Sequence, residues 1–425
     1  MSSLIVVPWA RRMGPRDPHE AHRVATPLEL FFDLVFVVAI ASAAAELHHG
    51  LSAGHLGTVV GYTMVFFAIW WAWMNYTWFA SAYDSDDVVY RLLTFTIMTG
   101  SLMLAAGVPD LFDDGQSGVV VAGYAVMRLG MVALWVRAAR AHPEGRWTAL
   151  TYAVGIAVVQ VLWIARLLLD GERVLMSTFF LLVLAELAVP VLAERFGGPT
   201  PFHPHHIAER FGLFTIIVLG EVILASVQAL QGALAAPTDA ASAGHAVESA
   251  ASGPGEAGGA GGGMNGSLAM LVAGGLLLVF SLWWLYFKRE HVDLIGQGRL
   301  MTWAFSYAHI VVFASVAAVG AALAAAVDVV QGVAEASPRT VALALAAALS
   351  LYALTLSGVH AVADRRLSVL AAAATLAAVA VAAALLDVDM GLRVLLIGLA
   401  AAGSVAHHVW LTHRPGAPTD AQAAR

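Results

Sequence analysis

The sequence contains no cysteine and a single lysine, and only 12% of its 425 residues are charged. Without cysteine, disulfides, thiolate metal sites and a cysteine nucleophile are excluded. The one lysine, Lys288, stands at the end of an apolar run, so a mid-membrane Schiff base with retinal or pyridoxal phosphate has no candidate residue. The net charge of −7 gives none of the basic character of a nucleic-acid-binding protein.

Catalytic motifs are missing as well. There is no nucleophile elbow, phosphate-binding loop or dinucleotide fingerprint. The first 25 residues carry arginines but are too polar to be a signal peptide. We therefore expect no cofactor, and enzymatic activity is the weaker alternative.

Apolar residues are abundant instead: they make up 60% of the chain, against about 45–50% in soluble domains. A membrane-spanning helix needs about 20 mostly apolar residues. Twelve segments meet this requirement, which predicts an all-α polytopic membrane protein. They run near 27–48, 58–80, 89–108, 118–139, 147–169, 173–194, 206–230, 267–288, 300–326, 339–362, 367–386 and 392–412.

The positive charges predict the orientation. With the N-terminus inside, 17 of the 22 lysine and arginine residues fall in inside segments. Arg173, Arg339 and Arg393 fall outside, whereas Arg128 and Arg166 lie within spans. We expect both termini to be cytoplasmic and the protein to reside in a bacterial cytoplasmic (inner) membrane.

Two blocks of sequence predict an internal duplication. FFAIWWAWMNY (66–76) matches LVFSLWWLYFK (278–288), and an arginine opens the following span in both halves. We expect two parallel six-helix repeats, 26–197 and 204–414, between an N-terminal tail (1–25) and a C-terminal tail (415–425). The Gly/Ala-rich stretch 232–266 reads as a disordered extracytoplasmic loop. The matched positions are Trp70, Trp71 and Arg91 in the first half and Trp283, Trp284 and Arg299 in the second.

The first span carries two carboxylates, Glu29 and Asp33, one helical turn apart and therefore on the same face. Thr26, Pro27 and Glu29 fit a capping box, which gives Glu29 a purely structural explanation. No capping role reaches Asp33, so we favour a functional role for it.

Further charges lie deep in other spans. Arg128 needs a partner or water, and its candidate partners are Asp33, Glu186 and Glu221. Glu186 and Glu221 are candidate proton carriers. We therefore predict an ion or proton pathway that includes Glu29, Asp33, Arg128, Glu186 and Glu221. In the alternative interpretation these charges only hold helices together.

A histidine-rich cluster is expected at the inner mouth of the seventh span. It comprises His203, His205, His206, Glu209 and Arg210. His205 and Glu209 stand four residues apart, a spacing that can grip a metal, but no second histidine completes a motif. A solvated interfacial cluster is favoured, and metal binding stays open.

The stretches TPLELFFDLVFVVAI (26–40) and HHIAERFGLFTIIVLGE (205–221) resemble the bacterial low temperature requirement A (LtrA) family over about 24–412. This resemblance implies a multipass inner-membrane protein connected with growth in the cold, without a defined activity. Arg23 and the Phe32-Asp33-Leu-Val-Phe36 run also resemble the first-helix signature of the lysosomal and bacterial potassium-channel family. Here no serine separates Phe32 from Asp33, and the second repeat has no aspartate at that position.

The sequence thus favours an ion- or proton-linked transporter or channel. The alternatives are a membrane enzyme that acts on a lipid at the inner face and a structural or regulatory membrane protein. The expected partners are the lipid bilayer and an unidentified small ion or solute, with a homodimer also open and no nucleic acid.

Overall fold

The computed structural model describes residues 7–20, 23–115, 117–235, 266–364 and 367–413. Their regular structure is helical, and none of these residues forms a β-strand. The all-α prediction is therefore confirmed. Most of the predicted 232–266 loop and the whole 415–425 tail lie outside the described residues.

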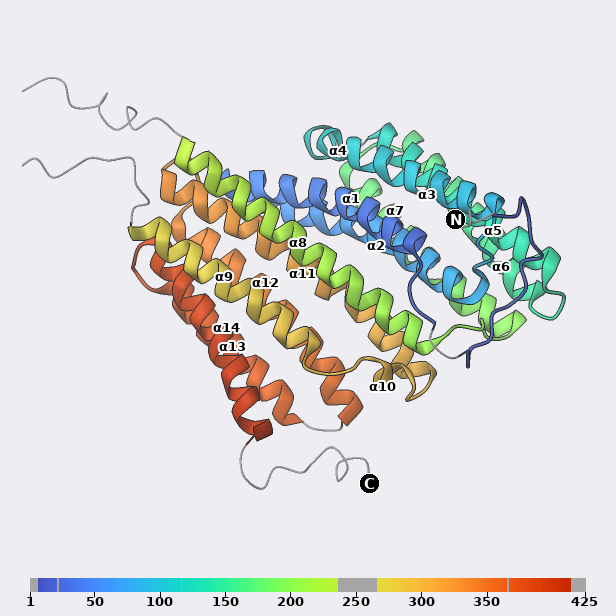
Figure 1. The fold of residues 1–425 in the computed structure, drawn as a ribbon. Coiled ribbons are helices and arrows are strands. Elements are labelled where there is room, and N and C mark those ends of the chain that lie inside the picture. The colour runs from blue at the N-terminus through green and yellow to red at the C-terminus, as the bar shows by residue number, and fades with distance from the viewer. Residues whose placement is uncertain (1–6, 21–22, 116, 236–265, 365–366, 414–425) are drawn as a thin grey trace, which may run out of the picture. The chain divides into compact units, whose positions relative to one another are not determined.

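Each of the twelve expected spans coincides with one long helix (Figure 1). Three short elements, α4 (Val108–Asp114), η1 (Arg166–Leu168) and α10 (Val292–Ile295), lie between them. The long helices are α1 (Pro27–Ser52), α2 (Thr58–Tyr83), α3 (Val88–Ala106), α5 (Gly118–Ala141), α6 (Arg146–Ala165), α7 (Glu172–Gly197), α8 (Pro204–Ala235), α9 (Gly266–Phe287), α11 (Arg299–Gln331), α12 (Pro338–Asp364), α13 (Leu367–Leu385) and α14 (Met390–His413).

Eleven helices of the described chain have the length and apolar composition needed to cross a membrane. The expected span that is not among them is α2, although its 26 residues carry no charge. Its tryptophans and tyrosines lower its hydropathy, and most of its residues are buried by protein. A helix that is enclosed by neighbouring helices does not need a lipid-facing apolar surface.

The chain forms two compact units. Unit 1 comprises residues 1–47, 57–218 and 289–314, and unit 2 comprises 48–56, 219–288 and 315–425. The helices α1, α8 and α11 are each divided between the two units. This division does not test the duplication into repeats 26–197 and 204–414, which stays a prediction.

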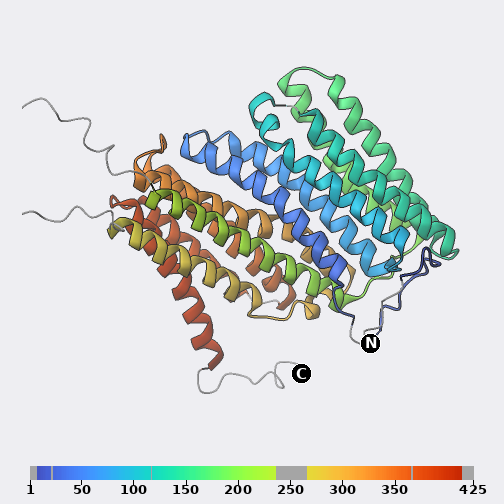
Figure 2. The ribbon, with the colours of Figure 1, turned by 45° about the horizontal axis from the view of Figure 1, so that its top comes forward.

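Helix α2 forms the core of unit 1, and α1 runs beside it in both ribbon views (Figures 1 and 2). Trp70, Trp71, Trp73 and Tyr76 are at most 1% exposed. The Trp73 ring stacks on Phe214 of α8 with a centroid separation of 4.3 Å. Aromatic burial of this size makes α2 the element against which the rest of unit 1 is packed.

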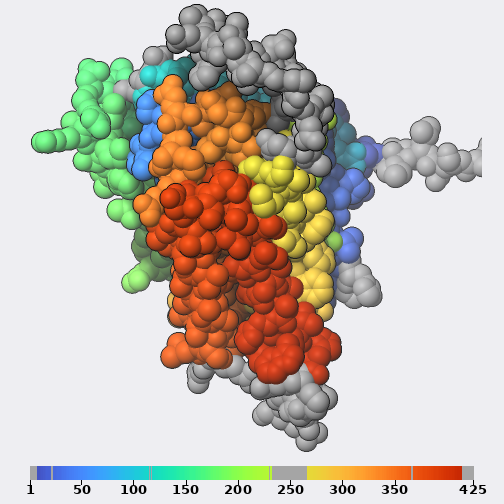
Figure 3. All heavy atoms as spheres, turned by 90° about the vertical axis from the view of Figure 1, so that its left-hand side faces the viewer, coloured from blue at the N-terminus to red at the C-terminus, as the bar shows by residue number. Residues whose placement is uncertain are grey.

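Glycines allow close helix crossings in both units. In unit 1, α3 meets α5 at Gly100 and Gly123, where an added Cβ on Gly123 would lie 2.5 Å from the Leu104 nitrogen. In unit 2, α9 meets α14 at Gly274 and Gly398. Figure 3 shows α9 in yellow beside the red C-terminal helices on one face of unit 2. Small residues that allow close backbone approach are a common basis of helix association in membranes.

We expect the substitution Gly123→Ala to lower the free energy of unfolding by about 1–3 kcal/mol, because the added methyl group meets backbone atoms that cannot move aside. The thermal unfolding midpoint of the protein in detergent measures this effect. Gly358→Ala in α12 is the matched control, since its added Cβ has no atom within 4 Å. Equal midpoints for the two variants would contradict a tight α3–α5 crossing.

Candidate functional site

The capping box predicted at the start of the first span is present. The Thr26 N–H donates to Glu29 Oε2 at 2.7 Å, and the Glu29 N–H donates to Thr26 Oγ1 at 3.3 Å. These two bonds begin α1 and orient the Glu29 side chain. The second carboxylate oxygen of Glu29 remains available for other contacts.

One turn further along α1, the Asp33 carboxylate is held by two side chains. Arg210 of α8 donates to both of its oxygens, at 2.6 Å and 3.2 Å. The indole N–H of Trp73 on α2 donates to Asp33 Oδ1 at 2.7 Å. Asp33 and Arg210 are both 0% exposed. A bidentate arginine with an added donor is among the strongest ways to hold a buried carboxylate.

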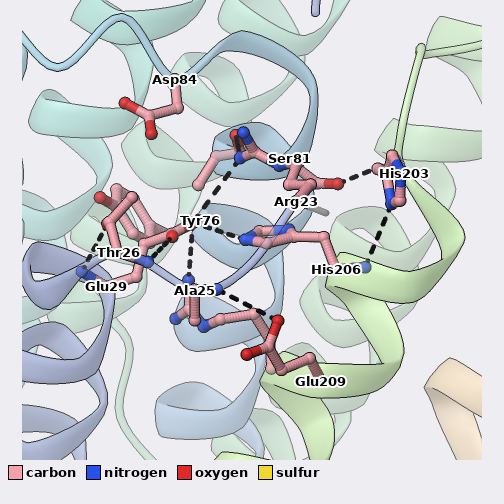
Figure 4. A network of polar contacts seen from close by, with 12 residues as sticks. Arg23, Ala25, Thr26, Glu29, Tyr76, Ser81, Asp84, His203, His206 and Glu209 are labelled. Atoms are coloured by element: carbon pink, nitrogen blue, oxygen red, sulfur yellow. Dashed lines mark hydrogen bonds and ion pairs between the residues drawn. The ribbon is translucent and has the colours of Figure 1, made fainter. Parts of the chain in front are cut away.

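The free oxygen of Glu29 completes a cluster with two cationic groups and an imidazole. Arg210 Nη1 lies 3.1 Å from Glu29 Oε1, His206 Nε2 lies 3.0 Å from it, and Arg23 Nη2 lies 4.0 Å away. Figure 4 shows the side chains of Glu29 and His206 turned toward one another. We call Arg23, Glu29, Asp33, His206 and Arg210 the buried charge cluster.

The buried charge cluster retains unused hydrogen-bonding capacity. Glu29 Oε1, Arg210 Nη1 and both ring nitrogens of His206 are buried, and among the described residues none is aligned with a hydrogen-bond partner. Two carboxylates balance two guanidinium groups, so one proton on His206 would change the net charge of a site that is buried from solvent. Such a site responds strongly to the arrival or loss of one charge.

The structure divides the predicted inner-face cluster. His206 and Arg210 point into the buried charge cluster, whereas His205 is exposed. Glu209 accepts a hydrogen bond from the Ala25 N–H at 3.1 Å, and His203 contacts the Glu20 carbonyl oxygen at 2.8 Å (Figure 4). No group of three or more histidine, aspartate or glutamate side chains in the described chain is placed to hold a metal ion.

A second buried ion pair links α5 and α7. Arg128 Nη2 lies 3.4 Å from Glu186 Oε2, so Glu186 is its partner among the three predicted candidates. Tyr124 donates to Glu186 Oε1 at 3.0 Å and also contacts Arg128, and the Trp71 indole donates to Glu186 Oε2 at 2.9 Å. Glu221 is half-buried and belongs to unit 2.

The repeat-signature residues have different surroundings in the two halves. Trp70 and Trp71 are buried, but Trp283 and Trp284 are 46% and 44% exposed. Arg91 pairs with Asp86 at 2.8 Å. Arg299 is exposed and lines a cavity of about 360 Å³ within unit 1.

Sequence reasoning missed this cavity and the two indole donors. The cavity is lined by residues of α2, α5, α6, α7, α10 and α11, of the α7–α8 and α10–α11 connections, and by the first residue of α8. No local sequence motif therefore predicts it. In the sequence, Trp70 and Trp71 stand out only as matched positions of the two predicted repeats. One feature of the sequence could have indicated the indole donors: tryptophan N–H groups on an aromatic helix are uncharged donors that can bind carboxylates of neighbouring helices.

These features define a polytopic α-helical integral membrane protein whose core contains buried ion pairs. The model of the bacterial low temperature requirement A protein (LtrA) family matches residues 24–405. The chain therefore belongs to the LtrA family.

The chain is 30% identical over 204 residues to an uncharacterized protein of Rhizobium meliloti (strain 1021). The matched region is 46% of this chain and 49% of the relative, so the chain spans about half the length of the curated relative it matches. No solved structure matches this chain.

Asp84, on the loop after α2, predicts a pH-dependent stability (Figure 4). Burial raises the pKa of Asp84 to about 6, with a contribution from the nearby negative charge of Glu29, and Arg16 at 3.8 Å offsets this only in part. The unfolded chain loses this proton near pH 4, while the folded protein keeps it up to about pH 6. Stability should thus fall as the pH rises through this window.

We expect Asp84→Asn to remove that decline and to raise the unfolding midpoint at neutral pH above that of the wild type. Unfolding midpoints measured between pH 4 and pH 8 test this. Asp389→Asn is the control, because the hydrogen bond from Ser267 lowers the pKa of Asp389 instead. A decline that persists in Asp84→Asn would show that another group causes it.

For the second ion pair we expect Arg128→Met alone to cost about 3–5 kcal/mol of stability, because it leaves Glu186 buried without its cation. The double variant Arg128→Met, Glu186→Met should recover most of that loss, since two apolar side chains replace the pair. Unfolding midpoints of the single and double variants measure the coupling. A double variant as unstable as the sum of the singles would argue against a direct pair.

Proposed function

We propose that this LtrA-family protein is a proton-linked transporter of the bacterial cytoplasmic membrane, with the buried charge cluster as its proton-coupling site. One observation carries the proposal: Glu29 Oε1 is approached by both His206 and Arg210 in a site where all three side chains are 0% exposed. Ionisable groups are costly inside a membrane protein and are concentrated where protons or ions move.

The coupling would rest on competition between guanidinium groups and protons for the same carboxylates. While Arg210 holds Asp33 and Glu29, its positive charge lies beside both carboxylates. If a conformational change withdraws Arg210, each buried carboxylate is left uncompensated and takes up a proton. His206, beside Glu29, is suited to deliver that proton.

A carrier is favoured over a permanently open channel. Glu29, Asp33, His206 and Arg210 are fully buried, and rings of the same helices pack against rings of α2, Phe32 against Tyr76 and Phe211 against Trp73. These four side chains have no solvent-exposed surface in this conformation, so a proton from bulk solvent would enter after a rearrangement. The arginine distribution along the sequence supports an orientation with both termini in the cytoplasm.

The test is a flux assay in liposomes that contain purified protein and a pH-sensitive dye. Proton, K⁺ and Na⁺ gradients are imposed, and a small-molecule extract of the expression host is added outside as a source of substrate. We expect proton movement that depends on the extract. It should fall at least about tenfold in Asp33→Asn and in Glu29→Gln, because each variant breaks a buried charge pair that is worth several kcal/mol, and about 1.4 kcal/mol already corresponds to a factor of ten.

The matched control is Asp328→Asn, which removes a partly exposed carboxylate bound to His48 in unit 2. It should keep the wild-type flux within about twofold, since surface pairs contribute little. Wild-type flux in Asp33→Asn would remove the cluster from the pathway. Absence of proton flux in wild-type vesicles under every gradient would contradict the proposed transporter.

A further inference from the structure

The cavity of unit 1 lies apart from the buried charge cluster, and nothing in the proposed coupling uses it. Its volume of about 360 Å³ is that of a site for a drug-sized molecule. We propose that it binds an organic ammonium compound with an aromatic or otherwise apolar body. The proposal rests on the proposed function, for which it names the class of substrate.

Aromatic rings make up much of the wall and come in three contacting pairs. Each pair holds its rings in fixed orientations, and the pairs come from different parts of unit 1. A preformed box of aromatic faces attracts cations through the ring quadrupoles and also accepts apolar groups. The pairs are Trp78 with Phe202 at 4.6 Å, Trp135 with Tyr152 at 4.1 Å, and Trp303 with Tyr307 at 5.4 Å between centroids.

The charges of the lining favour a cation inside. Glu194 of α7 is half-buried, and within the described residues no cationic side chain lies within 4.0 Å of its carboxylate. The charge of Arg299 acts on Glu194, but Arg299 is exposed and solvent screens its charge. Because Glu194 is less exposed than Arg299, its negative charge is screened less and dominates the electrostatic potential of the cavity.

One further group points to an oxygen on the ligand. Trp135 is 3% exposed and lines the cavity, and its indole N–H has no acceptor among the residues that the structure describes. An indole N–H is only a donor, and leaving it buried without a partner is costly. A hydroxyl, ether or carbonyl oxygen of the ligand would satisfy it.

Residues of the cavity and of the second ion pair lie on the same face of α7. Glu186, Pro190 and Glu194 follow one another at four-residue intervals on α7, so they share one face of the helix. Glu186 pairs with Arg128, whereas Pro190 and Glu194 line the cavity. Because Pro190 removes a backbone hydrogen bond at this point, α7 can bend between the two sites. A ligand in the cavity that bends α7 would thereby shift Glu186 relative to Arg128.

Binding is measured by calorimetry on the purified full-length chain in detergent at neutral pH. The probe is phenethylammonium, its neutral analogue is 2-phenylethanol, and its anionic analogue is 3-phenylpropionate. We expect the ammonium to bind at least about tenfold more tightly than either analogue, as a desolvated cation–π contact together with a carboxylate allows.

Substitutions of residues that line the cavity test whether the preference for the ammonium arises there. Glu194→Gln should lower the affinity for the ammonium by about tenfold and leave that for the alcohol unchanged. Trp303→Ala should weaken both, and Arg299→Gln is the control that keeps or improves ammonium binding. Glu194→Asp, which retains the charge, replaces Glu194→Gln if the latter does not elute as a single folded species, and it should keep the preference for the cation.

Equal affinities for ammonium and alcohol, preference for the anion, or no binding of phenethylammonium up to millimolar concentration would overturn this assignment. An unchanged ammonium affinity in Glu194→Gln would overturn it as well. The binding assay requires no proton flux. A failure here therefore leaves the liposome result standing, and a failure of the flux assay leaves the binding result standing.

Discussion

The buried guanidinium of Arg210 is the charge on which the core of unit 1 depends. It binds both oxygens of Asp33, which is 177 residues away in sequence, and approaches Glu29, so one cation on α8 compensates two carboxylates on α1. None of these charges could be buried alone, since the cost of removing any one from water exceeds what apolar packing of that side chain returns. The arrangement of α1 against the first half of α8 is therefore an electrostatic requirement.

Helix α2 extends the same principle to a second site. Trp73 donates to Asp33, and Trp71 donates to Glu186, the partner of Arg128. Residues two apart on a helix point to nearly opposite sides. One aromatic helix thus supplies an uncharged donor to each ion pair while its rings exclude water from both. Its lower hydropathy follows from this position, because a helix surrounded by protein is selected for packing and hydrogen bonding.

Much of the architecture was predictable, because the length of a span and the pattern of a capping box are local properties. All twelve spans, the Thr26–Glu29 cap and the need of Arg128 for a partner follow from single stretches of sequence. The pairing was not predictable, because hydropathy does not give the order of helices around a bundle. Arg210 was grouped with the exposed His205, although its four-residue spacing from His206 places these two on one face.

The two stretches that carry the family resemblance, 26–40 and 205–221, supply every residue of the buried charge cluster except Arg23. The cavity is built from other segments, but it shares α2 and α7 with the ion pairs: Trp71 and Asn75 are one turn apart, as are Pro190 and Glu194. A helix transmits a shift along its axis to every side chain on the moving face. A ligand that repositions α7 would therefore disturb the Glu186 pair, and through α2 it would alter the donor set of Asp33. In the proposed transporter, occupation of the cavity and proton affinity of the cluster would be linked in this way without direct contact between the two sites.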